Sequence, residues 1–336
     1  MPVRLKDVAR ELGVSVVTVS KVLRGAKDVG EETREKVLRR LKELKYQPNI
    51  MARGLATGRT FTMGLIVPDL VHPFFAELAK SLSGALRESH RALILASSEE
   101  DSDVEAQEIR TLLSRGVDVL LVASCQPQLH AFHDGADLQT PFVLIDRNFP
   151  DLSANFVGTD DVKAGEIATE HLIGLGRQHI AHIGGDQSST ALNRMRGYRN
   201  VLEQHGRESE DEMVMVCSRF EETGDVAGYQ CMQALLKKET RPDAVFCYND
   251  LTAIGAMKAA LDAGLSVPED VAFVGCGNMR YSDYLQVPLS SVDQNTRELG
   301  RAAARLALAI EQQSDLPPRS ILTEPRLVVR RSSAGS

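Results

Sequence analysis

The sequence predicts an α-helical helix-turn-helix headpiece and hinge helix joined to an α/β body of two doubly wound parallel-sheet subdomains. Three observations indicate this fold class. Residues 1–60 hold 14 Lys or Arg and 7 Asp or Glu, whereas residues 61–336 have a net charge of −14. The first segment has the apolar spacing of helices, while in the second apolar β-rich runs alternate with helical stretches. A length of 336 residues suits about two domains.

Three helices are predicted in the amino-terminal segment. In Leu5–Leu12 apolar residues recur at the i, i+3, i+4, i+7 positions of one helix face, and Gly13 follows where a helix ends. Ser15 is a suitable N-cap for a second helix, Val16–Leu23, and a third runs over Glu31–Leu44. Two helices joined by a short turn form a helix-turn-helix, whose second helix enters the major groove of DNA.

The net charge of residues 1–60, which include the headpiece (residues 1–48), decides between two interpretations of these helices. A small helical bundle with a solvated basic face is the alternative to a DNA-binding module. The net charge of +7 over residues 1–60 favours DNA, because neutralising phosphates requires such charge. Residues 49–60 contain Gly54 and Gly58 and predict a linker, in which Ile50–Ala56 is a two-turn helix too short to persist alone in water.

The body begins at Phe61 and consists of apolar runs rather than alternating ones, as expected for parallel strands covered on both faces. The predicted strands are Thr62–Pro68, Ala92–Ser97, Val117–Ala123, Phe142–Asp146, Phe156–Gly158, Ile180–Gly184, Met213–Val216, Ala244–Cys247, Val271–Gly275 and Pro325–Arg330. The predicted helices are Phe74–Ser89, Val104–Arg115, Gln128–Asp134, Ala164–Leu175, Arg196–Gln204, Gly224–Lys237 and Asp250–Ala263.

The pattern restarts after residue 160, which predicts two subdomains. We assign residues 61–160 with 292–322 to the first and residues 161–291 with 323–330 to the second. In such folds the ligand lies in the crevice at the carboxyl ends of the strands.

Several function classes are not expected. The chain has no G-x-S-x-G, H-E-x-x-H or phosphate-cradling glycine motif, so neither an enzyme nor a bound cofactor is predicted. Its five cysteines lack the C-x-x-C spacing of a metal or redox site. Neither a signal peptide nor an apolar run long enough for a membrane span is present, which predicts a cytoplasmic protein.

The headpiece motifs carry a specific resemblance. They are Lys6-Asp7-Val8-Ala9, Val14-Ser15, Thr18-Val19-Ser20, Val22-Leu23, Glu32-Thr33-Arg34 and Tyr46-x-Pro48-Asn49-x-x-Ala52-Arg53-x-Leu55. With these motifs the whole chain resembles the lactose/galactose repressor family of bacterial transcription factors. The resemblance implies a repressor of carbohydrate or related catabolic genes with a body like the periplasmic sugar-binding proteins. It implies a homodimer on a pseudo-palindromic operator, because protein two-fold symmetry mirrors operator symmetry.

The resemblance also assigns DNA contacts, position by position. Base contacts fall on Val16, Val17, Lys21 and the hinge residue Leu55. Phosphate contacts fall on Thr18, Ser20, Arg34 and Asn49. Valines suit thymine methyl groups, a lysine donates to guanine, and an apolar hinge side chain wedges into a minor-groove step. Packing on the headpiece is the alternative role for the hinge leucine.

The effector, a sugar, sugar acid or related metabolite, is expected in the cleft between the subdomains. The residues assigned to it are Asp69, Phe74, Phe75, Asp146, Asp160, Arg194, Phe220, Asn249 and Asn278. Core packing is the alternative for the two phenylalanines after His72-Pro73, and helix capping is the alternative for Asp160. Gly277 stands where many relatives carry Asp, which indicates an effector less hydroxylated or more anionic than a plain hexose.

Two other function classes remain open. A regulator of the catabolite-control type would take a phosphorylated carrier protein as corepressor, on the outside of the body. A solute-binding protein would share the fold of the body but would lack the headpiece.

Overall fold

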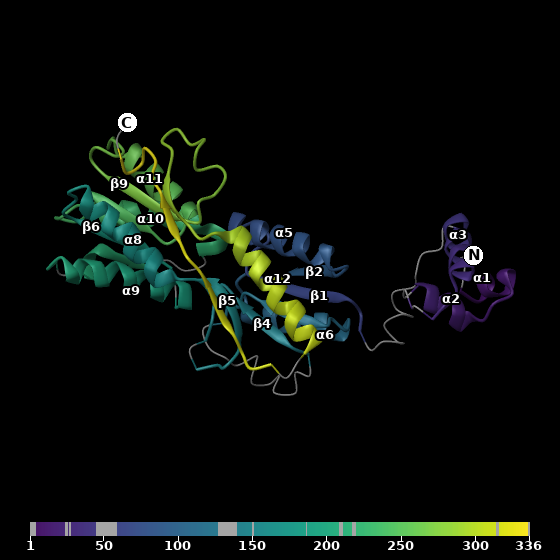
Figure 1. Cartoon of the computed structure of the whole chain (residues 1–336). Helices are drawn as coiled ribbons and strands as arrows, with labels where there is room; N and C mark the ends of the chain where they lie inside the picture. The colour runs from purple at the N-terminus through teal and green to yellow at the C-terminus, as the bar shows by residue number, and fades with distance from the viewer. Residues whose placement is uncertain are drawn as a thin grey trace. The chain divides into compact units, whose positions relative to one another are not determined.

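The computed structural model divides the chain into two compact units, Met1–Thr60 and Phe61–Ser336 (Figure 1). It describes residues 5–23, 26, 28–44, 59–126, 140–149, 151–185, 187–207, 211–216, 220–313 and 316–334, without the side chains of 220–222. Within these residues, none of the helices has both the length and the apolar character needed to cross a membrane.

The amino-terminal unit contains three helices, α1 (Leu5–Leu12), α2 (Val16–Leu23) and α3 (Glu31–Glu43). Their core consists of the buried residues Val8, Ala9, Val19, Val22, Val37 and Leu41. Gly13 has a φ of 65°, a left-handed conformation that ends α1 and that glycine adopts without strain. The Ser15 hydroxyl accepts a hydrogen bond from the Thr18 amide at 3.0 Å, which caps α2 as predicted.

The first sheet of the body has the strand order β11-β5-β4-β3-β1-β2, with all neighbours parallel. The strands are β1 (Thr62–Val67), β2 (Ala92–Ser97), β3 (Val119–Val122), β4 (Phe142–Ile145), β5 (Asn155–Thr159) and β11 (Ser320–Thr323). Helices α5 (Pro73–Glu88) and α12 (Thr296–Gln312) pack on one face, and α6 (Ser102–Ser114) packs on the other. We call this sheet with its helices the N-lobe.

The second sheet has the order β12-β10-β9-β8-β6-β7, and only the β10–β12 pair is antiparallel. The strands are β6 (Ile180–Gly184), β7 (Val214–Val216), β8 (Ala244–Cys247), β9 (Ala272–Cys276), β10 (Ser290–Asp293) and β12 (Arg326–Val328). The helices are α8 (Asp161–Gly174), α9 (Ser189–Gln204), α10 (Phe220–Leu235) and α11 (Asp250–Asp262), with the 3-10 turn η1 (Asp211–Met213). We call this sheet with its helices the C-lobe (Figure 1).

Most predicted elements are present, with shifts of a few residues at their ends. The strands β10 and β11 and the helix α12 were not among the predicted elements. The second sheet extends to Asp293 and the first to Thr323, slightly past the predicted subdomain boundaries. The predicted helices Gln128–Asp134 and Ile50–Ala56 lie outside the described residues.

Candidate functional site

The exposed face of α2 carries the residues predicted to read bases. Val16 and Val17 are 45% and 60% exposed, whereas Val19 and Val22 on the opposite face are buried in the headpiece core. Lys21, one helical turn after Val17, forms an ion pair with Asp28 at 2.5 Å while its side chain stays partly exposed. The headpiece therefore presents two apolar side chains and one cation on a single helix face.

The residues predicted to contact phosphates have structural partners in the headpiece. The Thr18 hydroxyl lies 2.8 Å from the Ser15 hydroxyl in the first turn of α2, where a helix dipole favours an anion. Ser20 is half-buried. Arg34 donates to the Ala26 carbonyl and thereby ties the turn before α3 to that helix. Asn49 and Leu55 lie outside the described residues.

In the body, Arg194 of α9 is the centre of a buried cluster. Its Nε and Nη2 atoms each lie 2.8 Å from Asp161 Oδ1, and its Nη1 donates to the Tyr248 carbonyl at 2.8 Å. The guanidinium also lies over the Tyr248 ring, 4.7 Å from the centroid. Helices α8 and α9 approach closely at Gly197: a Cβ at this position would lie only 2.1 Å from the Val162 carbonyl oxygen. Three of the five N–H groups of Arg194 are thus used by the described residues.

The electrostatics of this cluster follow from its burial. Removal from water raises the pKa of the Asp161 carboxyl to about 7, Arg194 opposes that shift, and the neighbouring Asp146 adds to it. Asp146, directly after β4, is itself buried. Acidic groups from both lobes therefore surround one arginine, an arrangement that suits a ligand with hydrogen-bonding hydroxyl groups.

Two contacts join the lobes around this cluster. The Asn249 Nδ2 atom lies 3.4 Å from His72 Nε2, which belongs to the residue that caps α5 of the N-lobe. The Asn148 amide, after β4, donates to the Ser189 hydroxyl of α9 at 2.9 Å. Asn249 also caps α11 by accepting from the Thr252 amide at 2.8 Å.

A pocket of about 640 Å³ lies between the lobes, and we call it the interlobe pocket. Its walls include Phe74 and Glu77 of α5 and the segment 277–281 after β9. Asn278, one of the predicted effector residues, lines this pocket and is held by Asp293 at 3.3 Å and Arg330 at 2.8 Å.

The remaining predicted effector residues occupy structural positions. Asp160 caps α8 by accepting from the Lys163 amide, and Asp69 accepts from the Val71 amide in a turn. Phe75 is 1% exposed and belongs to the N-lobe core. The Phe220 side chain lies outside the described part. The structure thus brings Asp146, Arg194 and Asn249 to one cluster, and it places Phe74 and Asn278 in the lining of the interlobe pocket.

Sequence reasoning missed three members of the cluster region. Asp161 holds the arginine, Tyr248 supplies a carbonyl and a ring, and Gln294 is buried beside Gly277. The available signal for Asp161 and Tyr248 was their position, since they adjoin Asp160 and Asn249, which were considered. Gln294 follows a strand that was not predicted, so the sequence offered no such signal for it.

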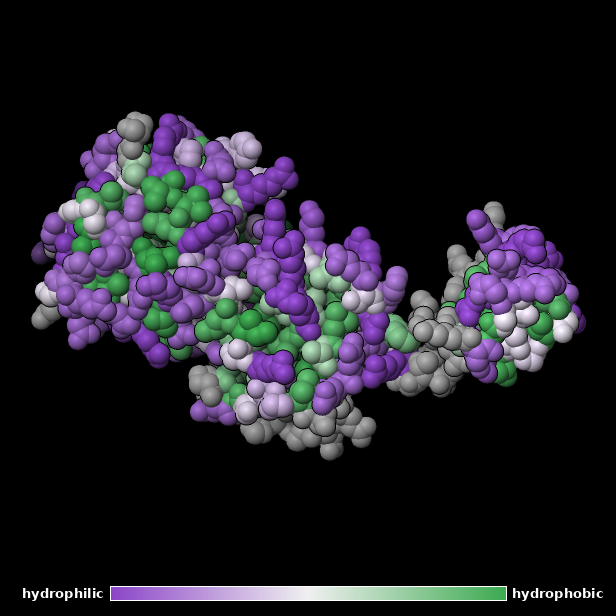
Figure 2. Space-filling model, in the orientation of Figure 1, coloured by the Kyte–Doolittle hydropathy of each residue, from purple (hydrophilic) through white to green (hydrophobic). Residues whose placement is uncertain are grey.

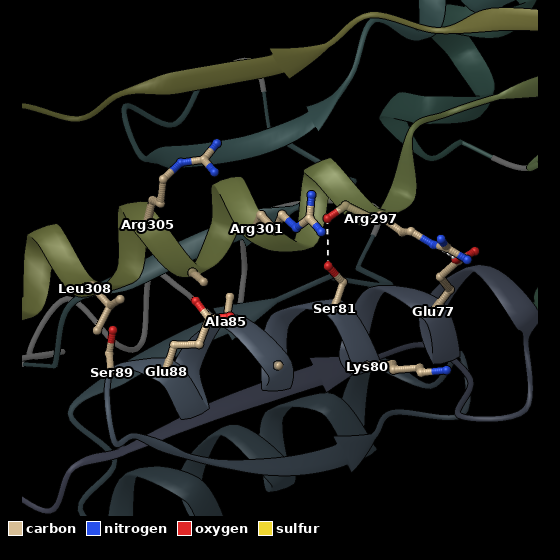
Figure 3. A pocket seen from close by; sticks show the side chains of 12 residues that line it. Glu77, Lys80, Ser81, Ala85, Glu88, Ser89, Arg297, Arg301, Arg305 and Leu308 are labelled. Atoms are coloured by element: carbon tan, nitrogen blue, oxygen red, sulfur yellow. Dashed lines mark hydrogen bonds and ion pairs between the residues drawn. The ribbon is translucent and has the colours of Figure 1, made fainter.

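A second pocket of about 640 Å³, the α5–α12 groove, runs along the outside of the N-lobe (Figure 3). Arg297, Arg301 and Arg305 follow one another along α12, and Lys80 of α5 faces the groove. These four cationic side chains outnumber the nearby carboxylates of Glu77, Glu88 and Glu298. Arg297 forms an ion pair with Glu77 at 2.8 Å, and Arg305 forms one with Glu298 at 2.7 Å.

Comparisons with known proteins find a matching family model for each of the two units. Residues 4–49 match "Bacterial regulatory proteins, lacI family", and residues 169–333 match "Periplasmic binding protein-like domain". The ribose operon repressor of Haemophilus influenzae is 34% identical over 98% of both chains. Catabolite control protein A of Staphylococcus xylosus is 32% identical over 98% of this chain and 99% of its own. The lac repressor dimer bound to operator and an anti-inducer is 25% identical, with a TM-score of 0.87 over 99% of this chain and 100% of its own.

Proposed function

This chain belongs to the lacI family of bacterial regulatory proteins, and from that premise we propose that it is a dimeric, ligand-responsive repressor of sugar-utilisation genes. The observation that carries the proposal is the combination of an exposed reading face on α2 with a buried polar cluster between two lobes. The first supplies DNA recognition, and the second supplies a site for a small effector. Because its target is chromosomal DNA, we infer that the protein acts in the bacterial cytoplasm.

We assign the effector to the region around Arg194, Asp146 and Asn249, with the interlobe pocket as its entrance. The two N–H groups of Arg194 that are left over can donate to ligand oxygens, and the Asp146 carboxylate accepts from ligand hydroxyls. Ligand contacts from both lobes would favour one lobe arrangement over another, which is the condition for regulation. The relation to a ribose operon repressor makes D-ribose the first probe.

A thermal-unfolding screen of the full-length protein tests this site. The panel contains D-ribose, other pentoses, hexoses and sugar acids, and the hit is then added to an operator selected from random DNA. We expect one sugar to raise the unfolding temperature and to change operator affinity. Arg194→Met should abolish the shift, whereas Arg199→Met, an exposed arginine on the same helix, should keep it. A sugar that stabilises both variants equally would show that the ligand does not bind at this cluster.

We place part of the dimer contact on strand β2. It is an edge strand of the first sheet, its side chains are only partly covered, and Leu95 is 41% exposed. Exposed apolar edges attract a second strand or chain. Hydrophobic patches interrupt the hydrophilic surface of the body in Figure 2. On the C-lobe, Tyr281 and Tyr284 are 63% and 81% exposed and offer a second apolar contact.

The α5–α12 groove supports a second candidate function, corepression by a phosphorylated carrier protein. Arg301 and Arg305 are each 63% exposed, and arginine suits phosphate because its donors bind two oxygens together. Catabolite control protein A is among the similar proteins. Capture of a serine-phosphorylated carrier protein by the wild type, lost in Arg305→Glu and kept in Arg110→Glu, which changes an exposed arginine of α6, would favour this function. Equal capture by both variants would reject the groove as its site.

A further inference from the structure

The lysine that is predicted to read a base lies beside a carboxylate. Lys21 Nζ forms an ion pair with Asp28 Oδ2 at 2.5 Å, and the two side chains are 40% and 58% exposed. Asp28 belongs to the segment between α2 and α3, and α2 itself contains no charged residue other than Lys21. A negative charge therefore adjoins the one cation of the helix that is expected to enter the major groove of DNA, a polyanion.

Backbone contacts fix the position of this carboxylate. The Ala26 amide donates to the Lys21 carbonyl at 3.0 Å, which ties the start of the segment to α2. The Ala26 carbonyl in turn accepts from the Arg34 guanidinium of α3. Val29, directly after Asp28, packs against the headpiece core. Asp28 thus lies on a segment that is attached to both helices and to the core, and its carboxylate faces the end of the lysine side chain.

Folding stability does not account for this ion pair. Two exposed charges contribute little to the free energy of unfolding, because water screens their attraction and both side chains lose freedom. A carboxylate near DNA also opposes non-specific binding, which depends on contacts between cations and phosphates. The effect of the Lys21–Asp28 pair is therefore expected in DNA recognition.

The chemistry of lysine shows what such a partner does. An ammonium group carries three N–H donors on a flexible four-carbon stem, and it binds phosphates as well as bases. A carboxylate that accepts from one of these donors restricts the directions of the other two, which can then reach O6 and N7 of one guanine. Arginine needs no such partner, because its planar guanidinium holds its donors in fixed directions.

We propose that Asp28 is a specificity-determining residue of the DNA interface and that it acts through Lys21. Its carboxylate orients the lysine ammonium toward one guanine and offsets the charge that the ammonium would otherwise offer to phosphates. Both effects favour the operator over non-specific DNA, because the first strengthens base readout and the second weakens sequence-independent binding. This inference rests on the proposed DNA-binding function, since it names how the reading face of α2 selects a base.

Operator selection with variants of the full-length protein tests the inference. The wild type enriches an operator from random DNA, and Lys21→Ala identifies the base pair that depends on the lysine. Asp28→Asn keeps the size of the side chain and removes its charge, so the preference for guanine at that base pair should fall by about fivefold or more. Affinity for non-specific DNA should rise, with a salt dependence steeper by about one to two counterions per dimer, because each headpiece frees one cation for a phosphate.

Glu43→Gln is the matched control. It also removes a headpiece carboxylate that forms an ion pair, here with Arg40 of α3 at 2.9 Å, and it should leave the base preferences of the wild type unchanged. A double variant separates a direct contact from an indirect one. In a chain that already carries Lys21→Ala, Asp28→Asn should cause no further change in base preference, since Asp28 acts through the lysine.

The outcomes distinguish the inference from the proposed function. An unchanged guanine preference in Asp28→Asn, a loss of preference at a different base pair, or an equal loss in Glu43→Gln would each overturn the inference and leave the proposed function intact. Base preferences that are unaltered by Lys21→Ala would also overturn it, because Asp28 would then have no reading lysine to orient. A wild type that enriches no operator would contradict the proposed function and the inference with it.

Discussion

Replacement of Arg194 by Met should destabilise the body strongly and in a pH-dependent way. Both partners of the Arg194–Asp161 pair have side chains less than 5% exposed. Breaking such a buried pair costs about 3–5 kcal/mol, because one charge is left buried and uncompensated. The Tyr248 carbonyl also loses its donor. Asp161→Asn in the same chain removes the stranded charge and should restore part of the loss.

The pH dependence has a definite sign. Burial already raises the pKa of Asp161 to about 7, and removal of the arginine raises it further. A carboxyl whose folded-state pKa lies above its unfolded value loses stability as the pH rises. The cost of Arg194→Met should therefore be larger at pH 9 than at pH 6, where the carboxyl accepts a proton.

Urea unfolding followed by far-ultraviolet circular dichroism measures this cost, since the chain contains no tryptophan. Arg199→Met on the same helix is the matched control. Its side chain is 46% exposed and pairs with Asp211 at 3.5 Å, so it should cost less than about 1 kcal/mol. A cost for Arg194→Met that is equally small at both pH values would refute the reasoning.

Four further predictions concern the headpiece, the dimer and the core. Leu55→Ala should lose specific operator binding in an anisotropy assay while the circular dichroism of the headpiece stays unchanged; normal operator affinity would exclude a minor-groove role. Lys21→Ala should cost about 1–3 kcal/mol and relax selectivity at one base pair in operator selection, and unaltered selectivity would exclude base reading. Leu95→Asp should give monomers in sedimentation, because a carboxylate is costly to bury at an apolar edge. A stable dimer of this variant would show that the dimer contact does not lie on β2. Burial lowers the pKa of His182 to about 4, so stability should fall by about 3 kcal/mol as the pH drops from 6.5 to 4, and His182→Phe should flatten that loss in urea titrations.

The elements that were predicted best are those whose sequence signals are local. Helices α1 and α2 were predicted to the residue, because apolar spacing, Gly13 and Ser15 act within a few positions. Strand β10 was missed because Ser290–Asp293 is short and mostly polar, and it becomes a strand only by pairing with β9 and β12.

The site was less predictable because its contacts join distant parts of the chain. Arg194 was identified, but its partner Asp161 lies 33 positions earlier and its carbonyl acceptor belongs to Tyr248, 54 positions later. The bond from Arg34 to the Ala26 carbonyl could not be predicted for a related reason, since it depends on the conformation of the turn before α3. The Gln294 carbonyl likewise accepts from the hydroxyls of Thr159 and Thr323, which come from separate parts of the sequence, so no local pattern predicts these contacts.

A small ligand between the lobes should control DNA binding by the headpiece. The most direct test is the affinity of the full-length protein for its selected operator, at fixed salt, with and without the sugar that raises its unfolding temperature. Allosteric coupling of about 1–3 kcal/mol predicts an affinity change of roughly 5- to 150-fold, lost in Arg194→Met and kept in Arg199→Met. Operator affinity that is unaffected by a saturating, stabilising sugar would contradict the account.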